Sequence, residues 1–306
     1  MCRPDFFEPA PPDPVHGHAN AFEAVGRIKF KEDPDGFREL ALQQWLRLEE
    51  IFSRHARIIH ITPTPGFYDQ AYTADASFSL QIYNGVPEPR TVSLLSMFTN
   101  EKRRPEIEAH RVALEKLGDN RTIVECKHAF EGNGDNVVDP FRNIIWSGYT
   151  DSAIFSNAAH GRTSLDAHGF LQEHTRIEVV GLQTVSPFYH IDTVLGPLTN
   201  GEIVAHYKSL HPASRDIFLR KAFHERGLDP GQYLIEISKE DAFSFATNFR
   251  CFGNTVVMPE CSQKLQDKIK SRGYEVETVD ISAFLAGGGG VHCLSNVLNE
   301  ISYERH

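Results

Sequence analysis

Apolar and polar residues along this chain follow a helical period and then an alternating period, and this order repeats. Residues 37 to about 56 carry apolar side chains at helical spacing after a start rich in acidic residues, which predicts an amphipathic helix. The run at 57–62 that follows predicts a short strand. The same helix-then-strand order recurs at 103–118 and 122–130, 163–175 and 176–184, 214–227 and 233–238, and 262–273 and 274–280.

Further strand-like runs lie between these pairs and extend each of them into a larger unit. They are 77–83, 91–98, 143–149, 191–198, 202–210 and 254–259. The 306 residues divide into five units of about 61 residues, a period typical of repeat or propeller-like arrays. Alternation of helix and strand is also general among α/β proteins, so the spacing predicts an α/β fold and leaves the repeat open.

The loop-forming segments favour a single domain that spans residues 1–306. At about 150 residues per domain, a chain of 306 residues is long enough for two. However, no low-complexity stretch or long linker divides it, and the proline clusters at 9–14, 63–65 and 87–89 are short. We interpret these clusters as loops or, in residues 1–20, as a partly extended N-terminal arm.

Composition and charge narrow the class of protein. The content of 41% hydrophobic and 24% charged residues is that of a folded globular chain. No stretch approaches the roughly 18 apolar residues of a membrane span, and the opening residues lack the pattern of a secretion signal. The net charge of −10 argues against nucleic-acid binding and favours a cationic small ligand. Five scattered cysteines without CxxC pairs are unlike a disulfide framework or a thiolate zinc site and favour a reducing, cytoplasmic compartment.

Two segments offer a nucleophile and a proton carrier. Four glycines at 287–290 precede His292 and Cys293, and such a loop can hold the cysteine at the start of a helix, where thiolate is favoured. The alternative is a glycine loop beside an inert cysteine. His190 and Asp192 stand two apart in a strand-like run, so the carboxylate would share a face with the imidazole and raise its basicity. The alternative is a strand-end histidine beside a solvated aspartate.

Three further groups of charged side chains are candidates for ligand binding. Glu131 and Asp135 lie on a glycine-rich turn, where carboxylates can hold a cation. Asp69 and Asp75 flank a short extended run, and two fixed carboxylates suit a planar guanidinium. Arg103 lies at a predicted helix start. Acidic turns and charged helix ends are also ordinary surface features, so none of these groups identifies a site by itself.

The order of these motifs along the chain resembles the guanidine-modifying, or pentein, superfamily, which includes arginine deiminases, amidinotransferases and dimethylarginine dimethylaminohydrolases. The motifs FEGNGD, FYHIDT and GGGGVHC, with the opening MCRPDFF, are most similar to the branch that holds dimethylarginine dimethylaminohydrolases and the cyanobacterial arginine dihydrolase domain. The resemblance extends from Cys2 to Asn296. It implies a five-bladed α/β propeller of ββαβ-type modules with pseudo-fivefold symmetry and the site at their common axis.

The resemblance also implies a covalent hydrolytic mechanism that needs no metal or organic cofactor. Cys293 would attack the guanidinium carbon, and His190 would protonate the leaving amine and then activate water. Glu131 and Asp192 would orient the substrate and His190. The implied partner is a cationic guanidino compound such as arginine or a methylarginine, and the residues expected to bind it are Asp69, Asp75, Arg103, Asp135 and His292.

Two positions depart from the family pattern. Many deiminase and dihydrolase relatives carry TAN where residues 73–75 are TAD here, whereas dimethylarginine hydrolases also have an aspartate there. Relatives that take free amino acids commonly have an arginine for the α-carboxylate where Asp151 and Ser152 stand, so Arg103, Arg162 or another residue would have to replace it.

Two other functions stay open at this stage. An amidinotransferase would use the same cysteine and histidine and differ in whether water or an amine resolves the intermediate. A non-enzymatic pentein scaffold is the other alternative, although such scaffolds lack the nucleophile and its histidine. The sequence is also compatible with a homo-oligomer.

Overall fold

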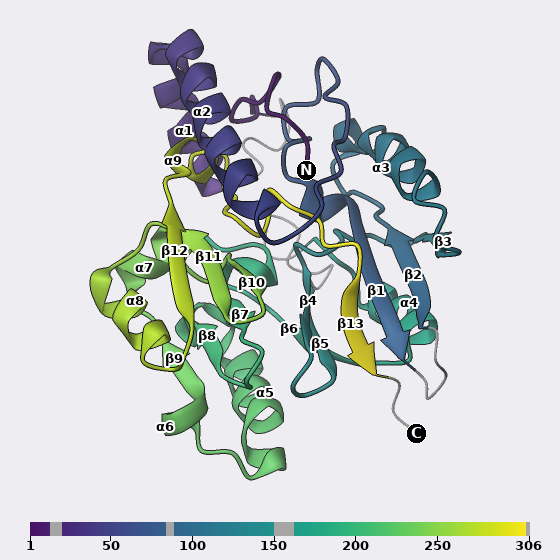
Figure 1. The fold of residues 1–306 in the computed structure, drawn as a ribbon, viewed down its shortest axis with the longest axis vertical. Helices are drawn as coiled ribbons and strands as arrows, with labels where there is room; N and C mark the ends of the chain where they lie inside the picture. Colours follow the sequence, from purple (N-terminus) through teal and green to yellow (C-terminus); the bar gives the residue numbers. More distant parts are fainter. Residues whose placement is uncertain (13–19, 84–88, 150–161, 304–306) are drawn as a thin grey trace.

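Four small sheets organise the protein (Figure 1). The computed structural model describes residues 1–12, 20–83, 89–149 and 162–303. Within these residues the strand orders are β13-β1-β2-β3, β4-β5-β6, β7-β8-β9 and β10-β11-β12. The fold is therefore mixed α/β, as the two alternating periods predict.

The four sheets repeat one unit of three strands. In each unit the first strand is antiparallel to the second, and the second is parallel to the third. The first strands are β1 (Ser77–Tyr83), β4 (Asn136–Asp139), β7 (Leu195–Pro197) and β10 (Arg250–Phe252). The second strands are β2 (Arg90–Leu95), β5 (Ile144–Gly148), β8 (Ile203–Ala205) and β11 (Thr255–Pro259). The third strands are β3 (Thr122–Glu125), β6 (Glu178–Leu182), β9 (Leu234–Glu236) and β12 (Glu275–Val279).

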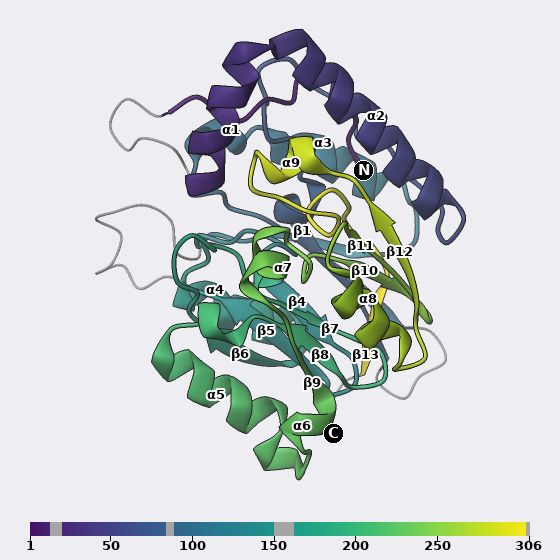
Figure 2. The same cartoon turned by 90° about the vertical axis from the view of Figure 1, so that its left-hand side faces the viewer.

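A helix joins the second strand to the third in every unit, because two parallel strands cannot be connected by a tight turn. These helices are α3 (Glu106–Glu115), α4 (Leu165–Thr175), α5 (Pro212–Ala222) and α8 (Gln263–Lys270), and Figure 2 shows α5 on the outside of the molecule. The shorter helical elements are α6 (Pro230–Tyr233), α7 (Lys239–Phe243), η1 (Thr73–Ala76), η2 (Glu101–Arg103), η4 (Ile191–Thr193), η5 (Tyr207–Ser209) and η6 (His224–Arg226). No helix in the described ranges combines the length and apolar character needed to cross a membrane.

Local chemistry explains where the predicted elements begin and end. The side chain of Ser262 caps α8 by accepting from the N–H of Leu265 at 3.2 Å, which agrees with the predicted helix start. Gly118, which follows α3, has a φ of 64°, as a glycine at a helix C-terminus requires. The strand predicted at 191–198 is shorter than expected, because its first residues form η4 and only β7 is extended.

The first predicted unit has its helix but lacks its strand. Helix α2 (Pro34–Ser53) follows α1 (Ala21–Glu32), and both lie beside α9 (Ser282–Leu285) at one end of the molecule (Figures 1 and 2). The strand predicted at 57–62 is wrong, because only Ile61 pairs there, in an isolated parallel bridge with Cys2. The N–H of Ile61 donates to the carbonyl of Met1, and the next donor of this ladder would be residue 63, a proline without an N–H, so the pairing stops there.

The C-terminal strand joins the first sheet instead of forming a sheet of its own. Strand β13 (Glu300–Tyr303) is parallel to β1 (Figure 1). The described residues therefore form four complete units and show no closed five-bladed propeller. The α/β class is confirmed, and the fivefold closure stays a prediction.

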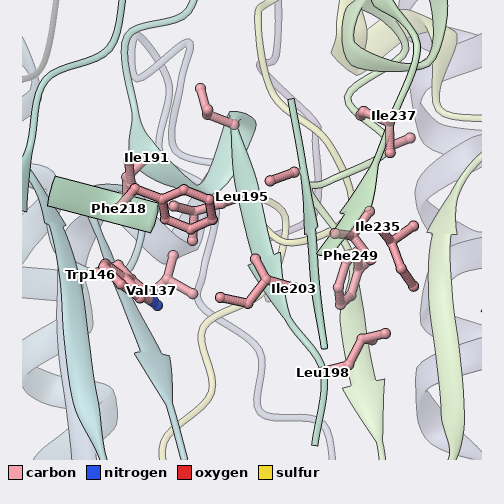
Figure 3. Packing of buried hydrophobic residues seen from close by; sticks show 14 of the residues in the cluster. Val137, Trp146, Ile191, Leu195, Leu198, Ile203, Phe218, Ile235, Ile237 and Phe249 are labelled. Carbon is pink, nitrogen blue, oxygen red and sulfur yellow. The ribbon is translucent and has the colours of Figure 1, made fainter. Parts of the chain in front are cut away.

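One hydrophobic cluster spans the second, third and fourth units. Figure 3 shows Trp146 of β5 beside Phe218 of α5, with ring centroids 5.5 Å apart, and Leu195, Ile203 and Phe249 nearby. Burial of each such side chain contributes roughly 1.5–3 kcal/mol. This shared core fixes the units against one another, so the segments that enter their first strands are held in place.

Candidate active site

The charged residues singled out in the sequence lie just before the first strands of the units. Contacts among them show that these segments meet: His190 contacts both Glu131 and Asp75, and the N–H of Ala74 donates to the carbonyl of Cys293 at 3.1 Å. The pairs are Asp69 and Asp75 before β1, Glu131 and Asp135 before β4, and His190 and Asp192 before β7. The repeat thus brings residues that are far apart in the chain into one buried cluster.

An ion pair between His190 and Glu131 lies within this cluster. Nε2 of His190 is 2.9 Å from Oε2 of Glu131, and both side chains are buried. Burial lowers the pKa of His190, but the charges of Asp135, Asp75 and Glu131 outweigh it and raise this pKa to about 9. Burial raises the pKa of Glu131, but the charges of Arg162 and His190 outweigh it and lower this pKa to about 2. At neutral pH His190 is therefore a cation that can act as a general acid.

Asp75 is a second carboxylate close to His190. Its Oδ1 is 3.7 Å from Nδ1 of His190, and its Oδ2 accepts from Nη1 of Arg103 at 2.8 Å. Arg103 is also paired with Glu106 at 3.2 Å and donates to the carbonyl of Asp69 at 3.3 Å. The sequence predicts Arg103 as a substrate ligand, whereas the structure shows its buried guanidinium holding Asp75 and the Asp69 backbone in place.

The thiol of Cys293 lies between Asp192 and Asn248. Sγ donates to Oδ2 of Asp192 at 3.3 Å and accepts from Nδ2 of Asn248 at 3.2 Å. Burial, followed by the charges of Asp192 and Asp75, raises the pKa of the thiol well above its usual value. The resting side chain is therefore a protonated thiol, and a cation beside these carboxylates would favour the thiolate.

Cys293 lies in a single turn, so the predicted helix start at this residue is wrong. The N–H of Leu294 donates to the carbonyl of Gly290 at 3.2 Å, and no helix continues from this turn through residue 299. Close contacts with neighbouring side chains explain why residues 287–290 are glycines. A Cβ on Gly289 would lie 2.4 Å from the Tyr72 ring. The backbone therefore passes closer to its neighbours than any other residue type would allow.

Asp192 contacts His292 and Cys293, and its predicted pairing with His190 on one strand face is wrong. Residues Ile191–Thr193 form η4, which does not alternate its side chains as a strand does. Oδ2 of Asp192 is 2.9 Å from Nδ1 of His292. Burial, then the charge of Arg250, lowers the pKa of His292 to about 4, so a neutral imidazole donates to this carboxylate.

Asp135 binds backbone groups on both of its oxygens. Oδ2 accepts from the N–H groups of Arg162 at 2.9 Å and Thr163 at 3.0 Å, and Oδ1 accepts from that of Ile191 at 3.3 Å. A Cβ on Gly148 would lie 2.1 Å from Oδ1. The sequence predicts Asp135 as a substrate ligand, whereas this geometry makes it a support for the loops that carry Arg162 and His190.

Three carboxylate oxygens of this cluster are buried and have no hydrogen-bond partner within the described residues. They are the Oδ1 atoms of Asp69, Asp75 and Asp192. Burial raises the pKa of Asp69 and of Asp75, because removal from water disfavours the charged form of each carboxyl group. Such oxygens suit a buried cation that can donate several hydrogen bonds, because an unpaired buried carboxylate is unfavourable.

Asp75, Glu131 and His190 each offer one atom that could bind a metal ion, and these three atoms lie within 4.8 Å of one another. A metal ion requires the neutral imidazole as a ligand. Since the pKa of His190 is raised to about 9, a protonated ring competes with metal binding at neutral pH. An organic cation with N–H donors therefore fits this cluster better than a metal ion.

Two further residues belong to this cluster: Asn248, which the sequence motifs did not indicate, and Arg162, which they suggested only as one possible ligand for a carboxylate. Asn248 lies two residues before β10, as Asp75 lies two residues before β1, so the repeat itself is the signal that could have found it. Arg162 is 3.4 Å from Glu131 and lies over the ring of Tyr189 at 4.7 Å. The predicted departure at 151–152 lies outside the described residues.

A buried cysteine, an ion-paired histidine and several carboxylates on this fold agree with the guanidine-modifying, or pentein, superfamily, to which the matching family model and the curated relatives assign the chain. The family model of eukaryotic N,N-dimethylarginine dimethylhydrolase matches residues 29–299. The chain belongs to this family.

Curated relatives agree with that assignment. The chain is 29% identical over 261 residues to the bifunctional arginine dihydrolase/ornithine cyclodeaminase AgrE of Nostoc sp., over 84% of this chain and 33% of that protein. It is 26% identical over 257 residues to the N(G),N(G)-dimethylarginine dimethylaminohydrolase of Mycobacterium tuberculosis, over 83% of this chain and 74% of that protein. The chain thus spans about a third of the length of the bifunctional cyanobacterial relative.

Solved structures show the same fold. The N-terminal domain of ArgZ, a cyanobacterial arginine dihydrolase solved with its substrate bound, has a TM-score of 0.77 at 23% identity and covers 98% of this chain and 97% of that chain. Unliganded AgrE has a TM-score of 0.76 at 26% identity, with 99% of this chain and 39% of that chain covered.

Proposed function

We propose that the protein is a cysteine-dependent hydrolase that cleaves a C–N bond of a guanidino compound through a covalent amidino-thioether intermediate. The observation that carries this proposal is the meeting of the Cys293 thiol, the His190 cation and three carboxylate oxygens without a hydrogen bond in one buried cluster of the described residues. A guanidinium carbon is a poor electrophile, so it needs a strong nucleophile and a positioned proton donor. The names of the relatives support the same reaction class.

The protonation states support a defined order of steps. A bound guanidinium offsets the charges of Asp192 and Asp75, so the Cys293 thiol gives its proton to solvent, and Sγ forms a bond to the guanidinium carbon as a C=N electron pair moves to nitrogen. The C–N bond then breaks as His190 delivers its proton to the leaving nitrogen. Neutral His190 next takes a proton from water, whose oxygen attacks the same carbon. The C–S bond breaks and its electron pair returns to sulfur, which takes the proton of the carbon-bound hydroxyl as the C=O bond of the product forms.

We further propose that the substrate carries an α-carboxylate that Arg162 binds. Its side chain is 12% exposed, and its backbone N–H is anchored by Asp135. The Arg162 side chain pairs with Glu131 in this structure. When the guanidinium of the substrate binds Glu131 instead, Arg162 can bind the carboxylate of the substrate. Asp75, which dimethylarginine hydrolases share by resemblance, favours arginine or a methylarginine as the substrate.

The decisive test is turnover of a panel of guanidines by the wild type and by Cys293→Ser. Arginine, methylated arginines, agmatine and guanidino acids are supplied, and ammonia, amines and ureido products are measured. We expect the variant to lose activity, while Cys261→Ser, which changes a cysteine beside α8, keeps it. Full turnover by Cys293→Ser would overturn the proposal, and transfer of the amidino group to an added amine would replace hydrolase by amidinotransferase.

A separate test addresses Arg162. We expect Arg162→Gln to raise KM for substrates with an α-carboxylate by roughly tenfold or more and to leave KM for agmatine, which lacks that group, nearly unchanged. Equal effects on both substrates would refute this assignment.

We also propose that the four complete units close into a five-membered arrangement with a reduced N-terminal unit. The parallel bridge of Cys2 with Ile61, on either side of α1 and α2, supports this proposal because it repeats the parallel pairing of second and third strands. An experimental structure that leaves a gap between β12 and the Cys2–Ile61 bridge would contradict it.

A further inference from the structure

Asn248 makes two side-chain hydrogen bonds to the same residue, Cys293. Its Oδ1 accepts from the backbone N–H of Cys293 at 3.1 Å, and its Nδ2 donates to Sγ at 3.2 Å. A backbone N–H can only donate, so the amide oxygen must face the backbone and the amide nitrogen must face sulfur. The orientation of this fully buried side chain is therefore fixed by chemistry.

The backbone around Asn248 is tied to both segments that carry reactive groups. Its carbonyl accepts from the N–H of His292 at 3.0 Å, and its own N–H donates to the carbonyl of Phe245 at 2.9 Å. The neighbouring Thr247 hydroxyl donates to the carbonyl of Asp192 at 3.4 Å. The amide is thus held rigidly between the segments of Asp192 and Cys293.

Gly290 is a second, independent indication that the position of the Asn248 amide is constrained. A Cβ added to Gly290 would lie 2.6 Å from Oδ1 of Asn248. The glycine carries no positive φ, so the contact with the amide, and not the backbone conformation, is what requires a residue without a side chain. The glycine run and Asn248 therefore form one packed unit around the sulfur.

We propose that Asn248 is a further catalytic group, which aims Sγ of Cys293 and donates a hydrogen bond to the negative sulfur formed when the thiol loses its proton. This inference rests on the proposed function for its catalytic meaning. Asp192 accepts from the neutral thiol, but its negative charge opposes the thiolate. The Asn248 N–H is the contact that strengthens as charge develops on sulfur.

The test compares Asn248→Asp with Asn254→Asp, an identical substitution at an exposed position of the same hairpin. The first readout is the rate of Cys293 alkylation by iodoacetamide against pH, with the modified cysteine identified by mass spectrometry. For Asn248→Asp we expect the alkylation midpoint to rise by about one pH unit or more, because a donor is replaced by a negative charge. For Asn254→Asp we expect the wild-type profile.

The second readout is steady-state kinetics with the guanidine that the product screen selects. We expect Asn248→Asp to lower kcat by roughly tenfold or more with little change in KM, since the contact serves the nucleophile. Gly290→Ala displaces the amide without removing it, and we expect a smaller change of the same sign in both readouts. It also serves as the test if Asn248→Asp does not fold.

An alkylation profile of folded Asn248→Asp, or of Gly290→Ala in its place, that superimposes on the wild type would overturn the inference. The alkylation readout needs no turnover, so it tests Asn248 even if no guanidine is hydrolysed. Conversely, turnover by Cys293→Ser would end the proposed function while leaving the effect of Asn248 on the thiol measurable.

Discussion

Glu131→Gln is expected to lower the pH at which His190 loses its proton. The substitution keeps the shape of the side chain and removes a negative charge 2.9 Å from Nε2 of His190. The pKa of His190 is about 9 against an ordinary value of 6.5, a difference worth roughly 3 kcal/mol. Glu131 is one of three carboxylates that raise it, and one opposite charge at this distance shifts a pKa by about 1–3 units. Because Asp135 and Asp75 remain in the variant, we expect a shift of about one to two units, to a pKa between about 7 and 8.

The sign of the effect on activity follows from the role of His190 as an acid. Because the raised pKa keeps the imidazole protonated, activity that needs the proton persists until the pH rises through about 9. In Glu131→Gln the alkaline limb of kcat/KM should fall about one to two pH units earlier. The assay is the pH dependence of kcat/KM, and NMR titration of the His190 ring measures the same pKa without turnover.

The matched control is Glu125→Gln on β3, where the carboxylate is 64% exposed. We expect this variant to keep the wild-type pH profile. If Glu131→Gln folds normally and both its alkaline limb and its imidazole titration coincide with those of the wild type, the electrostatic reasoning about His190 is refuted.

Three further predictions concern the scaffold. Gly148→Ala should reduce both activity and stability, because its Cβ would lie 2.1 Å from Oδ1 of Asp135. In the control Gly169→Ala, in α4, the Cβ meets nothing within 4 Å, and the free energy of unfolding in urea should rise by about 0.5–1 kcal/mol. Trp146→Ala should cost about 3–5 kcal/mol in the same assay, since the ring is fully buried in the shared core; a loss below about 1 kcal/mol would contradict the packing. Protonation of His190 stabilises the folded protein fully at pH values below 6.5, the ordinary pKa of histidine, and this contribution is lost as the pH rises through about 9. Tm should therefore fall between these two pH values, and it should fall by less in a variant without the Glu131 charge.

Several reactive residues could be predicted because their motifs are local. The residues around Cys293 and His190 occur in short, distinctive runs whose order along the chain resembles one superfamily. The contacts of these residues could not be predicted in the same way. Asp192 was expected to orient His190, but a 3-10 turn directs it to His292 and Cys293.

Asn248 shows the limit of motif reasoning most clearly. An asparagine in the run FATNF has no local pattern that marks it, and only the repeat of units places it beside Cys293. Arg103 shows the converse case. Its position in the motif was recognisable, and its ion pair with Glu106 is local, but its ion pair with Asp75 depends on how two distant segments pack.

The sequence by itself determined the alternation of helix and strand and most of the reactive residue types, because hydrophobic period and side-chain chemistry are properties of neighbouring residues. It did not determine the missing strand at 57–62, the single turn at Cys293 or the protonation states of the site. Strand formation needs a partner edge, and a pKa depends on burial and on charges brought close from other units. Those are properties of the packed chain. Only the tertiary structure therefore decided that His190 rests as a cation and Cys293 as a thiol, and that the Asn248 amide contacts this thiol.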